Sequence, residues 1–347
     1  MSKSQKEAFY NEFYSRQIVM RELGKKGQRK LANSKVAVIG LGGLGTISSL
    51  YLALAGVGRI RLIDQDTVEL NNLHRQVLYS KDDLHYPKAE VSAKRLGKVN
   101  PLVKVEPISE NLNVRNAEKL ISEMDCVVDG LDNMQTRYLV NRACAKLKIP
   151  YIFGAAIGME GNFSVFAPPE TPCLECVFPN IKDSEMLTCD VRGVLGATPG
   201  IIGTMQAMET IKVLTGIGSP LKGKLMICDF SDMYFTTIDI FKRENCPACQ
   251  GTAIQQKQEK LVWLCGRKTV NINPEKPLTL DLNQIYEKIR QHFKVRIKSQ
   301  LAILFNYKNY EISLFKGGRM LIKNVENEEK ALKIYKEITK KITKNQN

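Results

Sequence analysis

Residues 38–45 read Val-Ile-Gly-Leu-Gly-Gly-Leu-Gly, and this stretch decides the fold. The apolar residues 35–39 lead into it as a buried strand would, and a helix is expected at residues 44–55. Residues 59–63 form the next apolar run, so a strand, a glycine-rich turn, a helix and a second strand follow one another within about 30 residues. The turn lets the backbone approach phosphate groups at the beginning of the helix, as in nucleotide-binding βαβ units.

Apolar runs and helical patterns alternate along the first half of the chain. Further strands are expected at residues 103–105, 126–129 and 150–153, and helical segments at 9–33, 87–98 and 137–147. This alternation predicts an α/β fold with a Rossmann-like, mostly parallel sheet and helices on both faces. Beyond Gly161, residues 162–167 predict an antiparallel strand that extends the sheet. A helix within residues 193–216 and strands at 223–229 and 233–240 follow it.

The last quarter of the chain has the pattern of a separate small α+β module. Helices are expected at residues 282–293 and 328–342, with strands at 301–305, 310–315 and 320–322. We therefore predict two domains, residues 1–256 and residues 257–347, with a linker at 257–259.

The C-terminal module carries most of an uneven positive charge. The formal net charge of the chain is +15, and residues 257–344 contain 20 Lys and Arg against 9 Asp and Glu. Such a surface could bind nucleic acid, anionic lipid or an acidic protein, or could simply keep the protein in solution. Nucleic-acid binding is not expected, because the sequence has no nucleic-acid motif and no basic stripe interleaved with aromatic residues.

The composition indicates a globular protein of the cytoplasm. The chain has 347 residues, of which 44% are hydrophobic and 25% charged, enough to bury a full core. It has no run of about 18 apolar residues, and its first residues lack the apolar segment of a secretory signal, so neither a membrane span nor secretion is expected. Nine cysteines are an odd count, which argues against a secreted disulfide framework.

The residues after the glycine-rich turn distinguish between two kinds of nucleotide. Asp64 lies where a carboxylate would hold ribose hydroxyls, which fits NAD as well as ATP. The polar run that continues through Asp66 and Asn72 to Arg75 favours a triphosphate, because arginine binds phosphate oxygens as a bidentate fork. Lys88, at the beginning of an expected helix, is placed for another phosphate contact.

A second polar segment follows the strand expected at residues 126–129. Carboxylates at the carboxyl edge of a parallel sheet lie at the ligand crevice. Asp132 could hold Mg²⁺, which favours one or two carboxylates together with phosphates, or it could cap the helix that follows. Arg137 could pair with Asp132 or with phosphate.

Two Cys-x-x-Cys pairs provide four soft thiolates, a set that fits a closed, structural, tetrahedral zinc site. The four residues are Cys173, Cys176, Cys246 and Cys249. Two disulfides or reduced core cysteines are the alternatives. Cys189 stands apart as either a nucleophile, whose pKa Arg192 could lower, or a small buried residue.

Taken together, these residues resemble the ThiF/MoeB/HesA family, the prokaryotic relatives of ubiquitin-activating enzymes, over about residues 9–250. The markers are Tyr14-Ser-Arg16-Gln17, the turn from Gly40 to Gly45, Asp64-x-Asp66, Asn72-Leu-His-Arg75-Gln76, Pro87-Lys88, Asp132-Asn133, Cys189 and both Cys pairs. The resemblance implies ATP-dependent adenylation of the C-terminal glycine of a small ubiquitin-like (β-grasp) sulfur carrier ending in Gly-Gly, with release of pyrophosphate.

The resemblance also implies roles for individual residues. The ATP and Mg²⁺ site would comprise Gly40, Gly42, Gly43, Gly45, Asp64, Asp66, Asn72, Arg75, Lys88 and Asp132. Arg16 would reach the triphosphate, in many members from the other subunit of a homodimer, and the Cys pairs would bind Zn²⁺. Cys189 matches a position that forms a covalent intermediate in some members, and it would join Arg75, Lys88 and Asp132 as a catalytic residue.

Three hypotheses about function remain. The chain could adenylate a sulfur carrier for cofactor biosynthesis (molybdopterin or thiamine), tRNA thiolation or protein conjugation, it could adenylate a short peptide, or it could be a catalytically silent nucleotide-binding scaffold. The intact set of Arg75, Lys88 and Asp132 argues against the scaffold. The C-terminal module has no Cys in a rhodanese-like loop, so the sulfur donor would lie elsewhere, and we expect its basic surface to recruit an acidic carrier.

Overall fold

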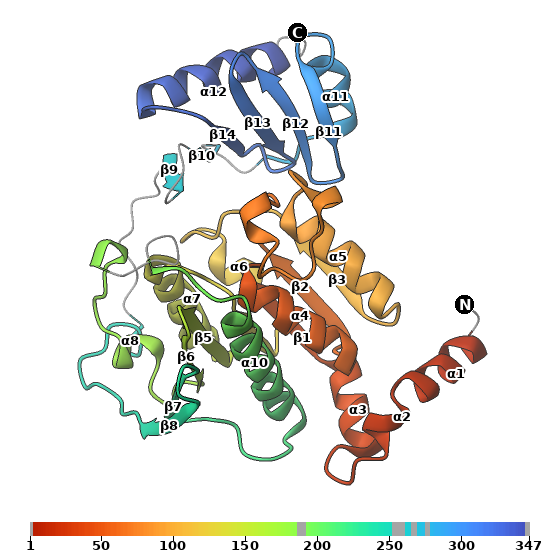
Figure 1. Ribbon diagram of the computed structural model, residues 1–347, viewed down its shortest axis with the longest axis vertical. Helices are drawn as coiled ribbons and strands as arrows, with labels where there is room; N and C mark the ends of the chain where they lie inside the picture. The colour runs from red at the N-terminus through yellow and green to blue at the C-terminus, as the bar shows by residue number, and fades with distance from the viewer. Residues whose placement is uncertain (1–2, 186–191, 252–260, 265–268, 275–277, 344–347) are drawn as a thin grey trace.

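The chain forms two β-sheets, each with its own helices. The computed structural model describes residues 3–185, 192–251, 261–264, 269–274 and 278–343. The first sheet has eight strands in the order β3-β2-β1-β4-β5-β6-β7-β8, and the second has six in the order β11-β12-β13-β14-β10-β9. The second sheet lies with α11 and α12 at one end of the molecule, above the α4 and α5 region of the first (Figure 1). The expected linker at 257–259 lies outside the described residues.

The first sheet is parallel in one part and antiparallel in the other, which confirms the predicted fold class. The strands linked by parallel pairing are β1 (Lys35–Ile39), β2 (Arg59–Ile63), β3 (Lys104–Ile108), β4 (Cys126–Asp129) and β5 (Tyr151–Ile157). The antiparallel extension consists of β6 (Glu160–Phe166), β7 (Lys224–Asp229) and β8 (Tyr234–Asp239). Because β1 pairs with both β2 and β4, the order in which the chain adds strands to the sheet reverses at β1. In sheets of this kind, ligands bind outside the carboxyl ends of the strands at such a reversal.

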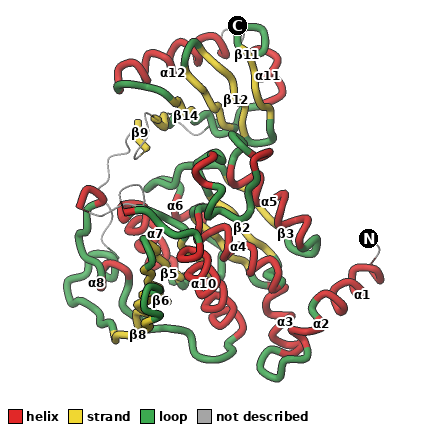
Figure 2. The backbone as a smooth tube through the Cα atoms, in the orientation of Figure 1, coloured by secondary structure: helices red, strands yellow, loops and turns green. Residues whose placement is uncertain are grey.

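Helices cover both faces of the first sheet because its central strands are apolar on both sides. In β1, Val36 and Val38 pack into one core cluster, while Ala37 and Ile39 pack into another. The first cluster is covered by α3 (Gly24–Asn33), α4 (Gly43–Ala55), α5 (Lys88–Val99) and α10 (Ala197–Thr215), and the second by α6 (Ala117–Ile121), α7 (Met134–Leu147) and α8 (Leu174–Val177). Figure 2 shows α10 running beside α4, against which it packs.

The segment before the first strand is not one helix but three. They are α1 (Lys3–Phe13), α2 (Ser15–Ile18) and α3. The described part of this domain also contains three short 3-10 helices: η1 (Leu70–Asn72), η2 (Lys81–Asp83) and η3 (Asp183–Glu185). No helix among the described residues is both long enough and apolar enough to cross a membrane.

The C-terminal module is an antiparallel sheet with two helices. Its elements are β9 (Leu261–Leu264), β10 (Thr269–Ile272), α11 (Leu282–Ile289), β11 (Lys294–Lys298), β12 (Ala302–Tyr307), β13 (Tyr310–Phe315), β14 (Met320–Lys323) and α12 (Glu328–Thr343). The helix expected to reach Phe293 ends at Ile289, and Phe293 lies beyond it with its ring centroid 5.1 Å from that of Phe305. The strand β11, which follows, was not predicted.

Candidate active site and metal centre

The glycine-rich turn joins β1 to α4 through contacts that leave no room for side chains. Gly40 has a positive φ of 86°, and a Cβ on Gly45 would lie 1.8 Å from the Gly40 carbonyl oxygen. A Cβ on Gly43, the first residue of α4, would lie 2.9 Å from Pro199 Cβ. The Pro199 ring and the backbone of the turn itself therefore pack closely against the N-terminus of α4, and helix N-termini favour anions such as phosphate.

Asp64, at the end of β2, is bonded to the glycine-rich turn. Its two carboxylate oxygens accept hydrogen bonds from the backbone N–H groups of Leu41 and Asp66, each at 2.6 Å. Burial raises the pKa of the Asp64 carboxyl to about 6, and the positive charge of Lys88 opposes this increase. The carboxylate thus lies beside the turn, where it can also accept hydrogen bonds from a ligand.

Lys88 and Asp66 lie next to this carboxylate. Lys88 begins α5, its side chain is 8% exposed, and its Nζ lies 3.4 Å from Asp66 Oδ2. The backbone N–H of Lys88 donates to the Asp66 carbonyl oxygen over 3.0 Å. An ion pair and a backbone hydrogen bond therefore connect the beginning of α5 to the loop that follows β2.

Asn72 and Arg75 follow on the 3-10 helix η1 and the turn beyond it. Asn72 is buried and completes the capping box of η1, because its Oδ1 accepts from the N–H of the N-cap residue Glu69 over 3.3 Å. Arg75 is half-buried, its Nη1 donates to the Asn71 carbonyl oxygen over 2.8 Å, and a Cβ on Gly43 would lie 3.7 Å from Arg75 Cδ. Arg75 thus reaches the N-terminus of α4, and Nε2 of its neighbour His74 lies 2.6 Å from Arg75 Nη1.

Arg137 pairs with Asp129, so the expected pairing with Asp132 was wrong. The Arg137 Nε donates to Asp129 Oδ2 over 3.0 Å, and both side chains are buried. The pKa of the Asp129 carboxyl is raised by burial, an effect that the charge of Arg137 opposes. Tyr151 O–H also donates to this carboxylate, over 2.8 Å, so the Arg137 side chain is held in a buried hydrogen-bond network between α7 and the sheet.

Asp132 remains exposed at the carboxyl edge of the sheet. The cap of α7 is the next residue, Asn133, whose Oδ1 accepts from Thr136 N–H over 2.9 Å, so the alternative of Asp132 as the cap was wrong. Asp132 Oδ1 accepts from Asn133 Nδ2 over 3.2 Å. An exposed carboxylate beside the crevice fits the ligand that Mg²⁺ prefers in a site shared with phosphates.

Sequence reasoning missed three polar residues at this edge. Gln206 of α10 donates to the Asp129 carbonyl oxygen over 2.7 Å, and Asp183 accepts from the backbone N–H of Met134 at the beginning of α7 over 2.5 Å. Arg319, from the C-terminal module, donates to the Gln65 carbonyl oxygen over 2.6 Å. No spacing signal connects them to the glycine-rich turn, because each comes from a distant part of the sequence.

Arg16 lies at the opposite end of α4 from the glycine-rich turn. It is exposed on α2, and its neighbour Gln17 reaches the Ala55 carbonyl oxygen, at the end of α4, over 3.5 Å. A helix of 13 residues is roughly 20 Å long at 1.5 Å per residue. The structure therefore does not bring Arg16 to the other candidate residues of the same chain.

Cys189 lies outside the described residues, which resume at Arg192. The Arg192 guanidinium forms an ion pair with Glu160, and its Nη1 donates to Glu160 Oε2 over 3.3 Å.

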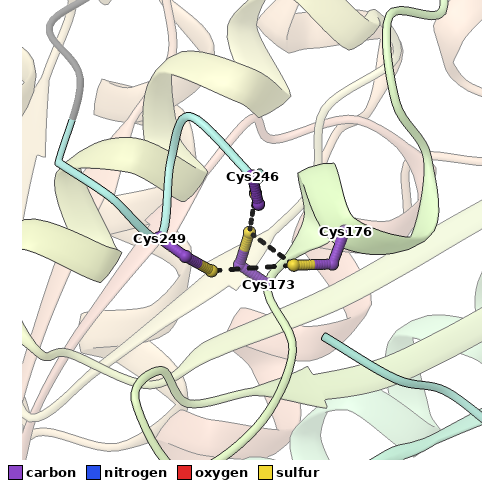
Figure 3. Close-up of side chains that lie close together, drawn as sticks. All are labelled: Cys173, Cys176, Cys246 and Cys249. Carbon is purple, nitrogen blue, oxygen red and sulfur yellow. Dashed lines mark hydrogen bonds between the residues drawn. The ribbon is translucent and has the colours of Figure 1, made fainter. Parts of the chain in front are cut away.

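The two Cys pairs converge on one point (Figure 3). The four Sγ atoms lie within 4.8 Å of one another, with neighbouring atoms 3.5, 3.6 and 3.8 Å apart. Disulfide sulfurs lie about 2.05 Å apart, whereas four sulfurs bound tetrahedrally at about 2.3 Å from a zinc ion lie roughly 3.8 Å apart. The cluster connects the beginning of α8 to the segment after β8, and its geometry fits a tetrahedral metal and not disulfides.

Comparison with known proteins identifies similar sequences. The ThiF family model matches residues 14–248. The sulfur carrier protein adenylyltransferase of Thermus thermophilus is 39% identical over 259 residues, which cover 73% of this chain and 96% of that protein. The adenylyltransferase and sulfurtransferase MOCS3 of Culex quinquefasciatus is 37% identical over 295 residues, covering 82% of this chain and 67% of that protein. The MOCS3 protein of Drosophila yakuba is 41% identical, and the match covers 60% of its length.

Solved structures show the same fold. Escherichia coli MccB has a TM-score of 0.62 at 26% identity, covering 72% of this chain and 75% of that one. PaaA has a TM-score of 0.56 at 25% identity, covering 70% of this chain and 76% of that one. The C-terminal module begins beyond the residues that the family model matches.

Proposed function

The chain belongs to the ThiF family, and we propose that it adenylates the C-terminal glycine of a small ubiquitin-like (β-grasp) sulfur carrier that ends in Gly-Gly. The observation that carries the proposal is the likeness to a sulfur carrier protein adenylyltransferase over 96% of that protein's length. The arrangement of Asp64, Lys88, Arg75 and Asp132 around the glycine-rich turn supports it, because this edge of the sheet offers both cations and carboxylates to a nucleoside triphosphate.

The reaction is an in-line displacement at phosphorus. A carboxylate oxygen of the carrier's C-terminus attacks the α-phosphorus of ATP, the bond to the bridging oxygen breaks, and pyrophosphate leaves with its electron pair. Arg75 and Lys88 would neutralise the charge that develops on the phosphate oxygens, and Asp64 would accept from the ribose hydroxyls. Asp132 would hold Mg²⁺, which when bound supplies further positive charge to the triphosphate.

The adenylated glycine is open to attack by sulfur. A sulfur atom of Cys189 or of an external donor would attack the glycine carbonyl carbon, and AMP would leave as the bond between this carbon and the phosphate oxygen breaks. Sulfur transfer in cofactor biosynthesis, tRNA thiolation or protein conjugation would follow. The exposed basic residues of β11, Lys294, Arg296 and Lys298, offer a surface to an acidic carrier. Reduced thiols in the four-cysteine cluster suit a protein of the cytoplasm.

We also propose that the four-cysteine cluster holds a structural Zn²⁺. The thiolates would come from two segments that are distant in the sequence, so the ion would tie the α8 region to the end of the antiparallel extension. Cys173 and Cys246 are fully buried, which leaves no open position for a substrate at their side of the cluster.

A homodimer would complete the site. Arg16 is too far from the turn of its own chain, so a second copy would have to supply it. Five large apolar side chains lie exposed on α4 and α10, an arrangement that marks an association surface: Tyr51, Leu54, Ile201, Met205 and Met208.

A second candidate function is adenylation of a peptide terminus. It is favoured by the structural similarity to MccB, which has been solved in complex with N-formylated MccA. Incubation of the full chain with ATP, Mg²⁺ and either a Gly-Gly-ended carrier or short peptides separates the two, with mass spectrometry detecting the adenylate. We expect adenylation of the carrier alone, and none of a carrier without its last glycine. Adenylation of the peptides alone would reject the carrier as substrate.

A further inference from the structure

The C-terminal module contacts the segments that carry the candidate nucleotide-binding residues. The backbone N–H groups of Gln300 and Leu301 both donate to the Glu90 carboxylate over 3.1 Å, two residues after Lys88 in α5. Lys323 Nζ lies 3.4 Å from Glu69 Oε1, in the segment between Asp66 and Asn72. The module therefore contacts two of the segments that carry candidate nucleotide-binding residues, the beginning of α5 and the loop after β2.

Arg319 makes the contact nearest to that pocket. It lies in the turn between β13 and β14, is 4% exposed, and donates through Nη2 to the Gln65 carbonyl oxygen over 2.6 Å. Its own position is fixed by Asn271, whose Oδ1 accepts from Nη1 over 2.8 Å, and by the Phe315 ring, 3.6 Å from its Cζ. A buried guanidinium held on two sides provides a rigid donor.

The peptide group that Arg319 contacts is also the one that holds Asp64. The Gln65 carbonyl and the Asp66 N–H belong to one planar trans peptide unit, so they point in opposite directions. Arg319 binds the oxygen of this unit, and the N–H of the same unit donates to Asp64 Oδ1 over 2.6 Å. The other oxygen of Asp64 accepts from Leu41 in the glycine-rich turn. Hydrogen bonds thus run without a break from the C-terminal module to the turn.

We propose that Arg319 is a positioning residue for the nucleotide, which acts by orienting the 65–66 peptide and through it the Asp64 carboxylate. The inference rests on the proposed function, since it assumes that this site binds ATP. Donation to the carbonyl oxygen polarises the peptide and strengthens the hydrogen bond made by its N–H. The module outside the matched family region is therefore part of the frame of the nucleotide site.

The test compares ATP and adenosine binding to the full chain by isothermal calorimetry. In Arg319→Leu the peptide loses its donor, and we expect the Kd for ATP to rise about tenfold or more, the usual effect of losing a hydrogen bond to a charged group. Arg319→Lys keeps the charge but cannot bridge Asn271 and Gln65, so its Kd for ATP should lie between those of the wild-type protein and Arg319→Leu. Arg290→Leu removes the exposed arginine that follows α11 and should leave the Kd unchanged.

A second readout separates positioning from general loss of structure. The Asp66 N–H lowers the pKa of Asp64, and the positive charge of Arg319 also interacts with this carboxylate. Arg319→Leu should therefore move the midpoint of pH-dependent adenosine binding upward from about 6, and Arg319→Lys, which keeps the charge, should also move it upward because the Asp66 N–H is displaced. Unchanged Kd and midpoint in a folded Arg319→Leu protein would overturn the inference while leaving the proposed function intact. A wild-type chain that binds no ATP would overturn both. If Arg319→Leu does not fold, wild-type affinity in Arg319→Lys would still overturn it.

Discussion

Arg137 Nε lies 3.0 Å from Asp129 Oδ2, and this ion pair is sealed between β4 and α7 with both side chains at most 5% exposed. The same guanidinium donates to the Leu131 and Gly154 carbonyl oxygens over 2.7 and 2.8 Å. Two carboxylates three residues apart therefore have different roles, since Asp129 is committed to the structure and Asp132 remains at the edge of the crevice.

Substitution of Asp129 should destabilise the fold. Asp129→Ala leaves the Arg137 charge buried without a partner, and we expect the free energy of unfolding to fall by about 3–5 kcal/mol. Urea denaturation followed by circular dichroism measures it. Asp132→Ala is the matched control and should change the same quantity by no more than about 0.5 kcal/mol. If Asp129→Ala and Asp132→Ala lowered the free energy of unfolding equally, the buried ion pair with Arg137 would not give Asp129 a structural role that Asp132 lacks.

The four-cysteine cluster should bind one zinc ion per chain. Cys246→Ser removes a buried ligand, so elemental analysis should find the metal reduced or absent, and the melting temperature should fall. Cys228→Ser alters a cysteine that is also buried but lies outside the cluster, and it should keep its zinc. Full zinc content in Cys246→Ser would contradict the proposed metal site.

Nucleotide binding should depend on the ionisation of Asp64. Its pKa of about 6 lies above the ordinary value for an aspartate, so the group takes up a proton as the pH falls through 6. If the ionised Asp64 carboxylate binds the ribose hydroxyls, the affinity for adenosine is constant above about pH 6 and declines below it, by up to about tenfold per pH unit. Adenosine is the appropriate ligand because it has no phosphate to titrate. Affinity that stays constant from pH 5 to 7.5 would argue against this role.

Two helical glycines should respond in opposite ways to alanine. A Cβ on Gly45 would lie 1.8 Å from a backbone oxygen, whereas one on Gly97 in α5 meets nothing within 4 Å. Gly45→Ala should therefore lower the melting temperature and abolish ATP binding, because the turn has to open. Gly97→Ala should raise stability by up to about 1 kcal/mol, the difference in helix propensity. A stable, ATP-binding Gly45→Ala protein would show that the turn is less constrained than its geometry implies.

The sequence predicts local structure well where one periodic pattern coincides with one element. The strands at 35–39, 59–63 and 126–129 and the convergence of the two Cys pairs follow from apolar runs and motif spacing. The partner of Arg137 could not be predicted, because a guanidinium near two aspartates is assigned only once the backbone shows which carboxylate is buried. The docking of Arg319 on Gln65 depends on how two separate sheets meet, and no periodicity in either segment encodes that contact.

The central claim is tested most directly by exchange of labelled pyrophosphate into ATP, with the full chain, Mg²⁺ and a carrier that ends in Gly-Gly. Exchange should require the carrier. The Asp132→Ala protein should remain folded, and its rate of exchange should be lower by about a hundredfold or more. A wild-type protein that binds ATP but catalyses no exchange with any such carrier would contradict adenylation of a sulfur carrier.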